Sequence, residues 1–361
     1  MNRKSMNKKN AKNQGWKIAG MGFAVLFLTI FLSGCDQSKT ISRSDFLLDT
    51  FVSITLFGET DERLLDKPFA RIAELNSSLT AFETESDLGL IKENAGIKPV
   101  SVSADTYKII AKSLAYSRDS GGYFDVTIAP LVDLWGIHSP ETKNAPASEA
   151  INAAKEKTDY TKIVLNPADQ SVYLTEAGMA VNLGAIAKGY IADEAMAVLK
   201  QEGVEHALIN LGGNVLVMGG KADNSDFGVG VEDPRNPGNG YLGVLSLKDG
   251  SVVTSGDYQR YFVDAAGKKY HHILDPFSGY PSDSGLIQVT VVAKASVDAD
   301  SLSTILFLVG LDEGLKKVEA LPDVEAIFIT NENKIVVTNG LNDAFVFDEE
   351  NYGDTYTLAI R

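Results

Sequence analysis

The chain has 361 residues, of which 44% are hydrophobic, so it is long enough for a large core or for two fused subdomains. Its formal net charge is −15, which argues against a nucleic-acid partner, because phosphate backbones require a basic footprint on the protein. The single cysteine excludes an intrachain disulfide and a metal cluster held by several cysteines.

The N-terminal segment has the pattern of an export signal. Six Lys and Arg side chains precede an apolar run over residues 18–32, which is marginal for spanning a hydrocarbon core of ~30 Å. The sequence Leu-Ser-Gly-Cys at 32–35 resembles a bacterial lipoprotein box, in which the signal is cleaved before Cys35 and that cysteine receives lipid. An uncleaved anchor with an incidental cysteine is the alternative, and both predict that the folded part lies outside the cytoplasmic membrane.

These features predict three parts: a lipoprotein signal peptide over 1–34, a lipidated polar tether over 35–45, and a folded domain over 46–361. Removal of 1–34 leaves 27 basic and 48 acidic residues, so the mature charge is −21. An anionic ligand would therefore need a local cation to hold it.

The apolar periodicity predicts helices separated by many strands. Helices are expected at 68–79, at 104–117, after Pro130, from about 187 to 200, from Asp300 as N-cap to Gly310, and around Val318. Strands are expected at 46–57, 162–165, 171–174, 207–211, 215–218, 228–231, 242–247, 252–254, 259–263, 286–293, 327–329 and 335–337. Residues 139–150 are expected to form an exposed loop. The pattern predicts an α+β fold with a largely antiparallel sheet.

The stretch 270–281 is the first candidate for acid–base chemistry. His271 and His272 stand shortly before Asp275, which is followed by a proline and a Ser-Gly turn signal. A histidine beside a carboxylate can exchange a proton near neutral pH. A hydrogen-bonded histidine next to a turn is the alternative, and local sequence leaves both open.

Two loops rich in small residues are candidates for phosphate binding. Residues 182–189 surround Lys188 with small side chains just before a helix, so backbone N–H groups and one ammonium could meet an anion. Residues 210–214 form a tight turn after a strand, for which simple turn geometry is favoured. The glycine pattern at 238–243 leads into a strand, so it is interpreted as a turn and not as a dinucleotide site.

Asp300 and Thr304 are four residues apart at a predicted helix start and so share one face. A carboxylate and a hydroxyl are hard oxygen ligands of the kind that Mg²⁺ prefers. A simple N-cap role for Asp300 is the alternative. The sequence contains no Gly-x-Ser-x-Gly elbow typical of a serine triad.

Taken in order, these segments resemble the ApbE family of FAD:protein FMN transferases. The resemblance covers residues 48–310 and rests on motifs at 123–127 (Tyr-Phe-Asp-Val-Thr), 182–190, 210–214, 233–235 (Asp-Pro-Arg), 254–258, 272–276 and 299–304. It implies a T-fold-like α+β architecture, with a mainly antiparallel sheet and flanking helices. It also implies an enzyme that transfers FMN from FAD to a Thr or Ser hydroxyl of a partner flavoprotein as a phosphoester and releases AMP.

The resemblance also implies the site. Mg²⁺ would be bound by Ala185 through its main-chain oxygen and by Asp300, Thr304 and Ser303. The residues implied to contact FAD are Leu48, Phe82, Tyr123, Phe124, Asp125, Asn182, Lys188 and Ile273. His272, with Asp275 near it, would accept the proton of the incoming hydroxyl, while Mg²⁺ stabilises charge on the departing AMP.

The sequence departs from the family pattern in four places. Leu-Asp-Thr at 48–50 replaces Met-Gly-Thr, Phe82 replaces a tyrosine, Asn182 an aspartate, and Ala185 a glycine. Two alternatives therefore remain: a Mg²⁺-dependent FAD pyrophosphatase that uses water as acceptor, and a non-catalytic flavin-binding lipoprotein. The expected partner is an acceptor flavoprotein of an extracytoplasmic or membrane electron-transfer system, and the expected location is the outer face of the cell membrane.

Overall fold

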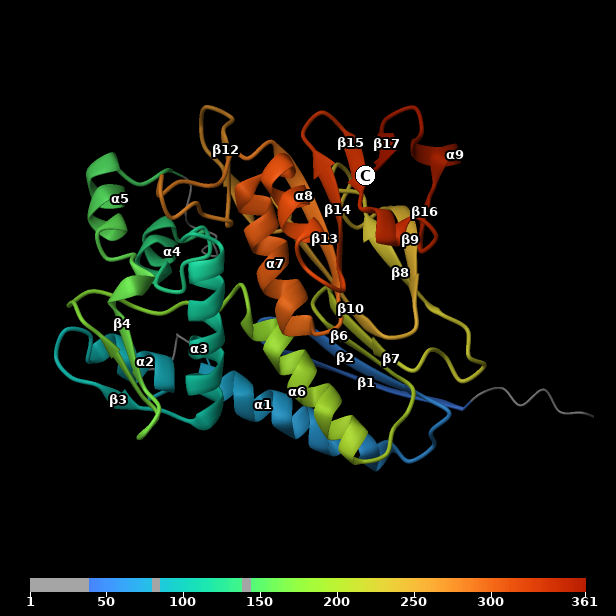
Figure 1. Cartoon of the computed structure of the whole chain (residues 1–361), viewed down its shortest axis with the longest axis horizontal. Helices are drawn as coiled ribbons and strands as arrows, with labels where there is room; N and C mark the ends of the chain where they lie inside the picture. The colour runs from blue at the N-terminus through green and yellow to red at the C-terminus, as the bar shows by residue number, and fades with distance from the viewer. Residues whose placement is uncertain (1–38, 80–84, 138–143) are drawn as a thin grey trace, which may run out of the picture. The chain divides into compact units, whose positions relative to one another are not determined.

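The computed structural model describes residues 39–79, 85–137 and 144–361, all within the compact unit Ser38–Arg361. Its central element is a nine-stranded sheet (Figure 1), in which every neighbouring pair is antiparallel except the last. In spatial order the strands are β1 (Thr40–Leu47), β2 (Thr50–Phe57), β6 (Ala207–Leu211), β7 (Asn214–Met218), β10 (Gly250–Gly256), β13 (Leu286–Ala293), β14 (Val324–Thr330), β15 (Lys334–Val337) and β17 (Thr357–Ile360). The predicted mainly antiparallel α+β fold is confirmed.

The sheet is covered on both faces. One face carries the helices α1 (Asp66–Leu79), α6 (Ala187–Gln201), α7 (Ser296–Val309) and α8 (Leu311–Glu319), and the other carries the small sheet of β16 (Phe345–Phe347), β9 (Tyr241–Leu247) and β8 (Phe227–Glu232). Successive side chains of β14 point to opposite faces of the central sheet. Ala326 and Phe328 join the core with the helices, whereas Ile327 and Ile329 join the core with the small sheet.

The remaining elements complete the unit. They are η1 (Glu62–Leu65), α2 (Asp87–Glu93), β3 (Val100–Ser101), α3 (Ala104–Asp119), α4 (Ala129–Trp135), α5 (Ser148–Lys155), η2 (Tyr160–Lys162), β4 (Ile163–Asn166), β5 (Ser171–Leu174), β11 (Tyr261–Val263), β12 (Lys269–His271), η3 (Asn339–Leu341) and α9 (Glu349–Tyr352). Figure 1 shows α2 to α5 grouped with β3 and β4 beside the central sheet. In the part of the chain that the structure describes, no helix has the length and apolar character needed to span a membrane.

The strand expected over 46–57 is a hairpin of two strands. Leu48 and Asp49 form its turn at φ values of 57° and 54°, a conformation typical of the tight turns that reverse a strand. Residues from Thr40 onward therefore already pair with β2, although they were expected to belong to the tether. The alternating pattern comes from β2, in which Val52, Ile54 and Leu56 are buried at every second position.

Two further expectations are corrected. Part of the loop expected at 139–150 is helix α5, which begins at Ser148; residues 138–143 lie outside the described residues. Helix α7 begins at Ser296, one turn before Asp300, so Asp300 is not its N-cap. The N-cap residue Ala295 has no side-chain acceptor for the first N–H groups of α7, and a residue of another helix supplies one.

That acceptor is Asp193 of α6, which caps α7 from the side. Its two carboxylate oxygens accept the N–H groups of Ser296 and Val297 at 2.8 and 2.9 Å. In the reverse direction, the Asp300 carboxylate of α7 accepts the N–H of Gly189, in the first turn of α6, at 2.9 Å. Each helix thus satisfies N-terminal donors of the other, which would otherwise be left without partners.

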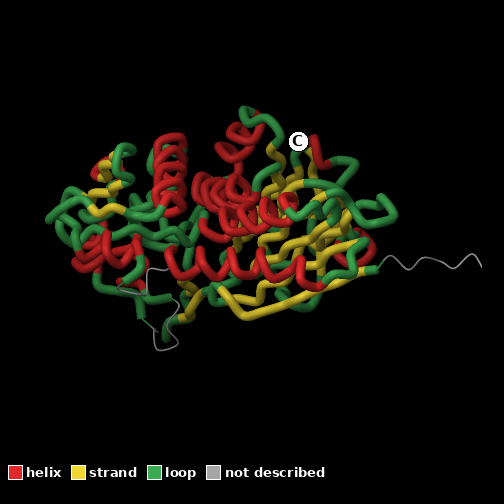
Figure 2. Tube along the Cα trace, turned by 90° about the horizontal axis from the view of Figure 1, so that it is seen from below, coloured by secondary structure: helices red, strands yellow, loops and turns green. Residues whose placement is uncertain are grey.

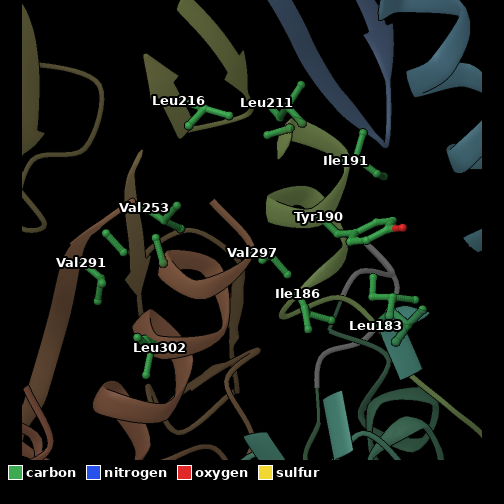
Figure 3. Close-up of a cluster of buried hydrophobic side chains, with 14 of the residues drawn as sticks. Leu183, Ile186, Tyr190, Ile191, Leu211, Leu216, Val253, Val291, Val297 and Leu302 are labelled. Atoms are coloured by element: carbon green, nitrogen blue, oxygen red, sulfur yellow. The ribbon is translucent and has the colours of Figure 1, made fainter. Parts of the chain in front are cut away.

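The two helices also share the buried core of the helix-covered face. Figure 3 shows Ile191 of α6, Val297 and Leu302 of α7, and Val253 and Val291 of the sheet in this cluster. Figure 2 shows the helices stacked on the strands in the perpendicular view. This core fixes the position of α6 and α7 against β10 and β13.

The close contact of the helices predicts that Gly189→Ala destabilises the protein. A Cβ on Gly189 would lie 2.3 Å from the main-chain oxygen of Ser296, so the helices would have to separate. Alanine normally stabilises a helix by about 1 kcal/mol relative to glycine, but overpacking against backbone should reverse the sign and cost about 2 kcal/mol or more. Thermal unfolding of the purified variant measures this, and an unchanged or raised Tm would contradict the tight contact.

Candidate functional site

Asp300 is a buried carboxylate with one oxygen in use. The residue is 4% exposed, and its Oδ2 accepts the Gly189 N–H. Its Oδ1 has no hydrogen-bond partner among the described residues. Since a buried carboxylate needs compensation for its lost hydration, the second oxygen is available to bind a cation.

The same hydrogen bond changes the start of α6. The N–H of Gly189 would ordinarily bond the carbonyl four residues earlier, that of Ala185, but it donates to Asp300 instead. Across residues 39–79, 85–137 and 144–361, no N–H bonds the Ala185 carbonyl. The structure therefore leaves unused the main-chain oxygen that the sequence resemblance assigns to Mg²⁺.

Hydroxyl groups gather on the next turn of α7. Ser303 donates through Oγ to the main-chain oxygen of Asp300 at 2.8 Å, and its Oγ lies 2.8 Å from Oγ of Ser255, which is on β10. The Oγ1 of Thr304 lies 3.5 Å from the same Ser255 oxygen. Asp300, Ser303 and Thr304 thus lie on the α7 surface that faces β10.

This donor set suits a hard cation. Among the described residues, no group of three or more His, Cys, Asp or Glu side chains could hold a metal. The candidate set contains one carboxylate together with hydroxyl and carbonyl oxygens. A single negative charge is too little for a metal site in which the protein supplies every ligand. Mg²⁺ is typically bound by one or two carboxylates with substrate phosphates and water, so the residues present fit an ion that shares its shell with a substrate.

Lys188 supplies a positive charge next to this set. Its Nζ donates to Oδ1 of Asn214, the first residue of β7, at 2.6 Å. Burial lowers the pKa of the Lys188 ammonium, and the negative charge of Asp300 partly opposes this shift. Asn214 itself is 1% exposed, so it holds the ammonium in one position.

The two histidines have different environments. His271 is 7% exposed: its Nε2 lies 2.9 Å from the carbonyl of Ser282, and its Nδ1 accepts the N–H of Ile273 at 3.3 Å. Burial lowers the pKa of His271. With both nitrogens in internal hydrogen bonds, His271 has a structural role.

His272 is more exposed and lies beside the turn that follows β10. Its Nδ1 is 3.2 Å from the main-chain oxygen of Arg260, and its backbone N–H donates to the same oxygen at 3.1 Å. Because a carbonyl can only accept, this contact favours the tautomer with the proton on Nδ1. Nε2 is then the basic nitrogen, which supports His272 over His271 as a proton acceptor.

Asp275 shapes the turn after His272. Its Oδ1 accepts the N–H of Phe277 at 2.9 Å, and its own N–H donates to the carbonyl of Tyr280 at 2.8 Å. Asp275 therefore stabilises the Asp-Pro-Phe turn through its backbone and one oxygen. Its assistance to His272 stays a prediction.

The aromatic loop at 123–125 has one exposed member. Tyr123 is 36% exposed and makes an edge contact with Phe277 at 5.0 Å between ring centroids. Phe124 is buried in the core. Asp125 accepts from Thr127 N–H and hydroxyl, and burial raises the pKa of its carboxyl. The structure thus places Tyr123 at the surface and uses Asp125 to hold the loop.

The aromatic loop meets the Lys188 loop directly. The N–H of Asn182 donates to the carbonyl of Val126 at 2.8 Å, and its side-chain oxygen caps the N–H of Gly184 at 2.8 Å. Asn182 therefore fixes the shape of the segment that leads to Lys188. An asparagine oxygen serves this role as well as the aspartate of the family pattern.

The remaining predicted flavin contacts lie in different places. Ile273 is buried, 6% exposed, with its carbonyl bonded to the N–H of Ser282. Leu48 lies in the β1–β2 turn, next to Thr50, whose side chain contacts the turn at Gly212. Phe82 lies outside the described residues.

Sequence reasoning missed two partners of the site. The Lys188–Asn214 bond joins residues from two different motifs, and the sequence favoured simple turn geometry for the second motif. Ser255 was predicted only as part of the family motif at 254–258, yet its hydroxyl contacts both Ser303 and Thr304. The signal in both cases was a polar residue at the end of a buried strand.

Comparison with known proteins agrees with the resemblance. The family model described as "ApbE family" matches residues 48–328. A protein of Klebsiella pneumoniae named FAD:protein FMN transferase is 38% identical over 307 residues, covering 84% of this chain and 93% of that protein. A Treponema pallidum protein of the same name is 30% identical, covering 91% of this chain and 94% of its own length.

A solved structure extends the similarity to the fold. The crystal structure of the ApbE protein of Thermotoga maritima superposes with a TM-score of 0.78 at 28% identity, covering 85% of this chain and 99% of that chain. The family model and both relatives cover most of the chain. The chain therefore belongs to the ApbE family.

Proposed function

We propose that this protein transfers FMN from FAD to a Thr or Ser hydroxyl of a partner flavoprotein, forming a phosphoester and releasing AMP. The name FAD:protein FMN transferase on relatives of 38% and 30% identity supports this reaction. The observation that carries the proposal is the convergence of Asp300, the unused Ala185 carbonyl and Lys188 around the start of α6. These groups suit the phosphates of a dinucleotide and a cation that accompanies them.

Each group of the chain has a role in this reaction. Asp300 and Thr304, with the Ala185 carbonyl, would bind Mg²⁺, and Lys188 would neutralise phosphate charge in a chain with an excess of acids. When bound, Mg²⁺ would supply electrostatic stabilisation of charge on the phosphates. His272 would accept the proton of the acceptor hydroxyl through Nε2, so that the oxygen can attack phosphorus as AMP leaves.

The activity is tested by incubating the purified chain with FAD and Mg²⁺, with and without a candidate acceptor domain. We expect the acceptor to gain the mass of one FMN, as measured by mass spectrometry, with stoichiometric AMP. Free FMN and AMP in the absence of acceptor would instead identify a pyrophosphatase. Intact bound FAD in the presence of a competent acceptor would identify a flavin carrier, and either result would overturn the transferase.

We expect His272→Ala to lower the rate of transfer by about 10²–10⁴-fold at saturating FAD, the usual contribution of a general base. Single-turnover transfer to the acceptor measures the rate, and FAD affinity measured by fluorescence serves as the control for folding. Undiminished transfer would exclude His272 as the proton acceptor. His272→Gln should behave like the alanine variant, because an amide cannot accept the proton.

We expect Asp300→Asn to raise the Mg²⁺ concentration needed for half-maximal transfer by about tenfold or more, since the cation loses its carboxylate ligand. An asparagine oxygen can still accept the Gly189 N–H, so the Tm should change little. Asp298→Asn is the matched control on the same helix, because Asp298 pairs with Lys112 and Tyr116 away from the site. If the wild type, Asp300→Asn and Asp298→Asn showed the same Mg²⁺ dependence, Asp300 would not be a ligand of the metal.

We also propose that lipid on Cys35 holds the protein at the extracytoplasmic face of the cell membrane, where it would meet its acceptor. The lipoprotein-like sequence at 32–35 supports this location. Cys35→Ser should abolish incorporation of labelled fatty acid and prevent signal cleavage before that position, both measured on immunoprecipitated protein. Continued lipid labelling of the variant would disprove the assignment.

A further inference from the structure

The hairpin of β1 and β2 has one face turned away from the helices. Val52, Ile54 and Leu56 of β2 point into the core that the helices share, so their neighbours along the strand point the other way. In the register of the two strands, six residues share this outer face: Ser42, Ser44, Phe46, Phe51, Ser53 and Thr55. The outer face of the hairpin therefore presents hydroxyl groups and two aromatic rings, and none of these side chains is charged.

The two aromatic rings of the outer face are exposed. Phe46 is 61% and Phe51 75% exposed, and their ring centroids lie 5.6 Å apart in an edge contact. The small sheet reaches the hairpin at its other end, where Phe57 contacts Phe227 at 5.2 Å between centroids. β1 is also the edge strand of the central sheet (Figure 1). An exposed aromatic pair beside a sheet edge favours contact with another surface.

The absence of charge distinguishes the outer face from the chain as a whole. After removal of residues 1–34, the chain has 48 acidic against 27 basic residues. An anionic lipid surface repels a chain of this charge. The repulsion is smallest where a face carries no carboxylate, and there hydroxyl groups can bond with lipid headgroups while aromatic rings enter the interface. The chemistry of the outer face therefore suits a lipid surface.

The proposed lipid anchor lies close to the hairpin along the chain. Thr40, the first residue of β1, stands five residues after Cys35. A chain of five residues extends to about 17 Å at most, so the start of β1 cannot lie further than this from the lipid-bearing cysteine. The hairpin is the first described element after the anchor, and the membrane is within its reach.

We propose that the β1–β2 hairpin docks on the membrane through its outer face, with the rings of Phe46 and Phe51 inserted among the lipid headgroups. The inference goes beyond the proposed reaction and rests on the proposed anchor at Cys35. A lipid anchor alone leaves the domain free to turn about its tether. The docked hairpin is a second contact, and it fixes one orientation of the domain.

This orientation brings one end of the candidate site near the membrane. The carbonyl of Phe51 accepts the N–H of Gly212 at 3.1 Å. Gly212 stands two residues before Asn214, which binds the ammonium of Lys188. The inserted rings and the proposed phosphate-binding lysine are therefore linked through one turn. The orientation favours an acceptor domain that is attached to the same membrane.

The test places a fluorescent reporter on the outer face of the full chain. Phe51→Trp is reconstituted in vesicles of phosphatidylcholine and phosphatidylglycerol, with or without bromine on the upper acyl chains, and the emission of the wild-type chain is subtracted. Bromine should lower the added emission about twofold, since interfacial side chains enter about 5–10 Å into the headgroup and acyl boundary. Ile97→Trp is the matched control outside the hairpin, because Ile97 is 71% exposed. Its emission should not respond to bromine.

Phe46→Asp in the Phe51→Trp chain should remove most of the quenching, because a carboxylate beside the reporter opposes entry of the ring into an anionic interface. Thermal unfolding is the control for folding, and the Tm should stay unchanged because Phe46 is exposed. Quenching that persists in this variant would contradict insertion of the pair.

Equal quenching of Phe51→Trp and Ile97→Trp would overturn the proposal. So would emission of Phe51→Trp that changes only when the acceptor is added or the protein concentration is raised, because the outer face would then bind an acceptor or a second copy. Labelling of Cys35 with fatty acid reads the anchor separately. A labelled chain without quenching refutes the docking alone, and an unlabelled chain that is still quenched refutes the anchor alone.

Discussion

The exchange of helix caps between α6 and α7 organises this structure. Asp193 of α6 holds the first N–H groups of α7, and Asp300 of α7 holds the N–H of Gly189 in α6. The glycine allows the two backbones to touch. Asp300 is buried and Asp193 is half-buried, so each carboxylate needs donors or a cation to compensate for lost hydration. The cap thus fixes the contact between the two helices and, in the described part of the chain, leaves the second oxygen of Asp300 and the carbonyl of Ala185 without internal hydrogen bonds.

Much of the fold followed from local patterns, with two exceptions. Alternation located β13 to β15, and helical periodicity located α1 and α3, because each buries one face on a core. The start of α7 could not be located, since its cap comes from Asp193, far away in the sequence, and not from its own N-terminus. The β1–β2 turn was missed because Leu48 is not a typical residue for positive φ.

At the candidate site, the sequence indicated which residues could take part but not what each side chain does. The motifs supplied His272, Lys188 and Asp300 as candidate residues, because their types suit phosphate chemistry. The prediction of His272 as the proton acceptor gains support from the burial and the two internal hydrogen bonds of His271. The sequence could not show that the Asp125 carboxylate accepts hydrogen bonds from Thr127 in its own loop and from the N–H of Tyr160. Roles of this kind depend on which oxygen or nitrogen is already bonded, and that is a property of tertiary structure.

The order of the central sheet has a consequence for the speed of folding. β2 ends at Phe57 but pairs with β6, which begins only at Ala207, and β17 closes the other edge with nearly the last residues of the chain. Pairings so distant in sequence require large loops to close, at a cost in entropy, before stabilising contacts can form. This topology therefore has a high contact order and is expected to fold slowly. Until β6 forms, the first hairpin presents the aromatic pair Phe46 and Phe51 and an unpaired edge, a combination that favours aggregation of the nascent chain.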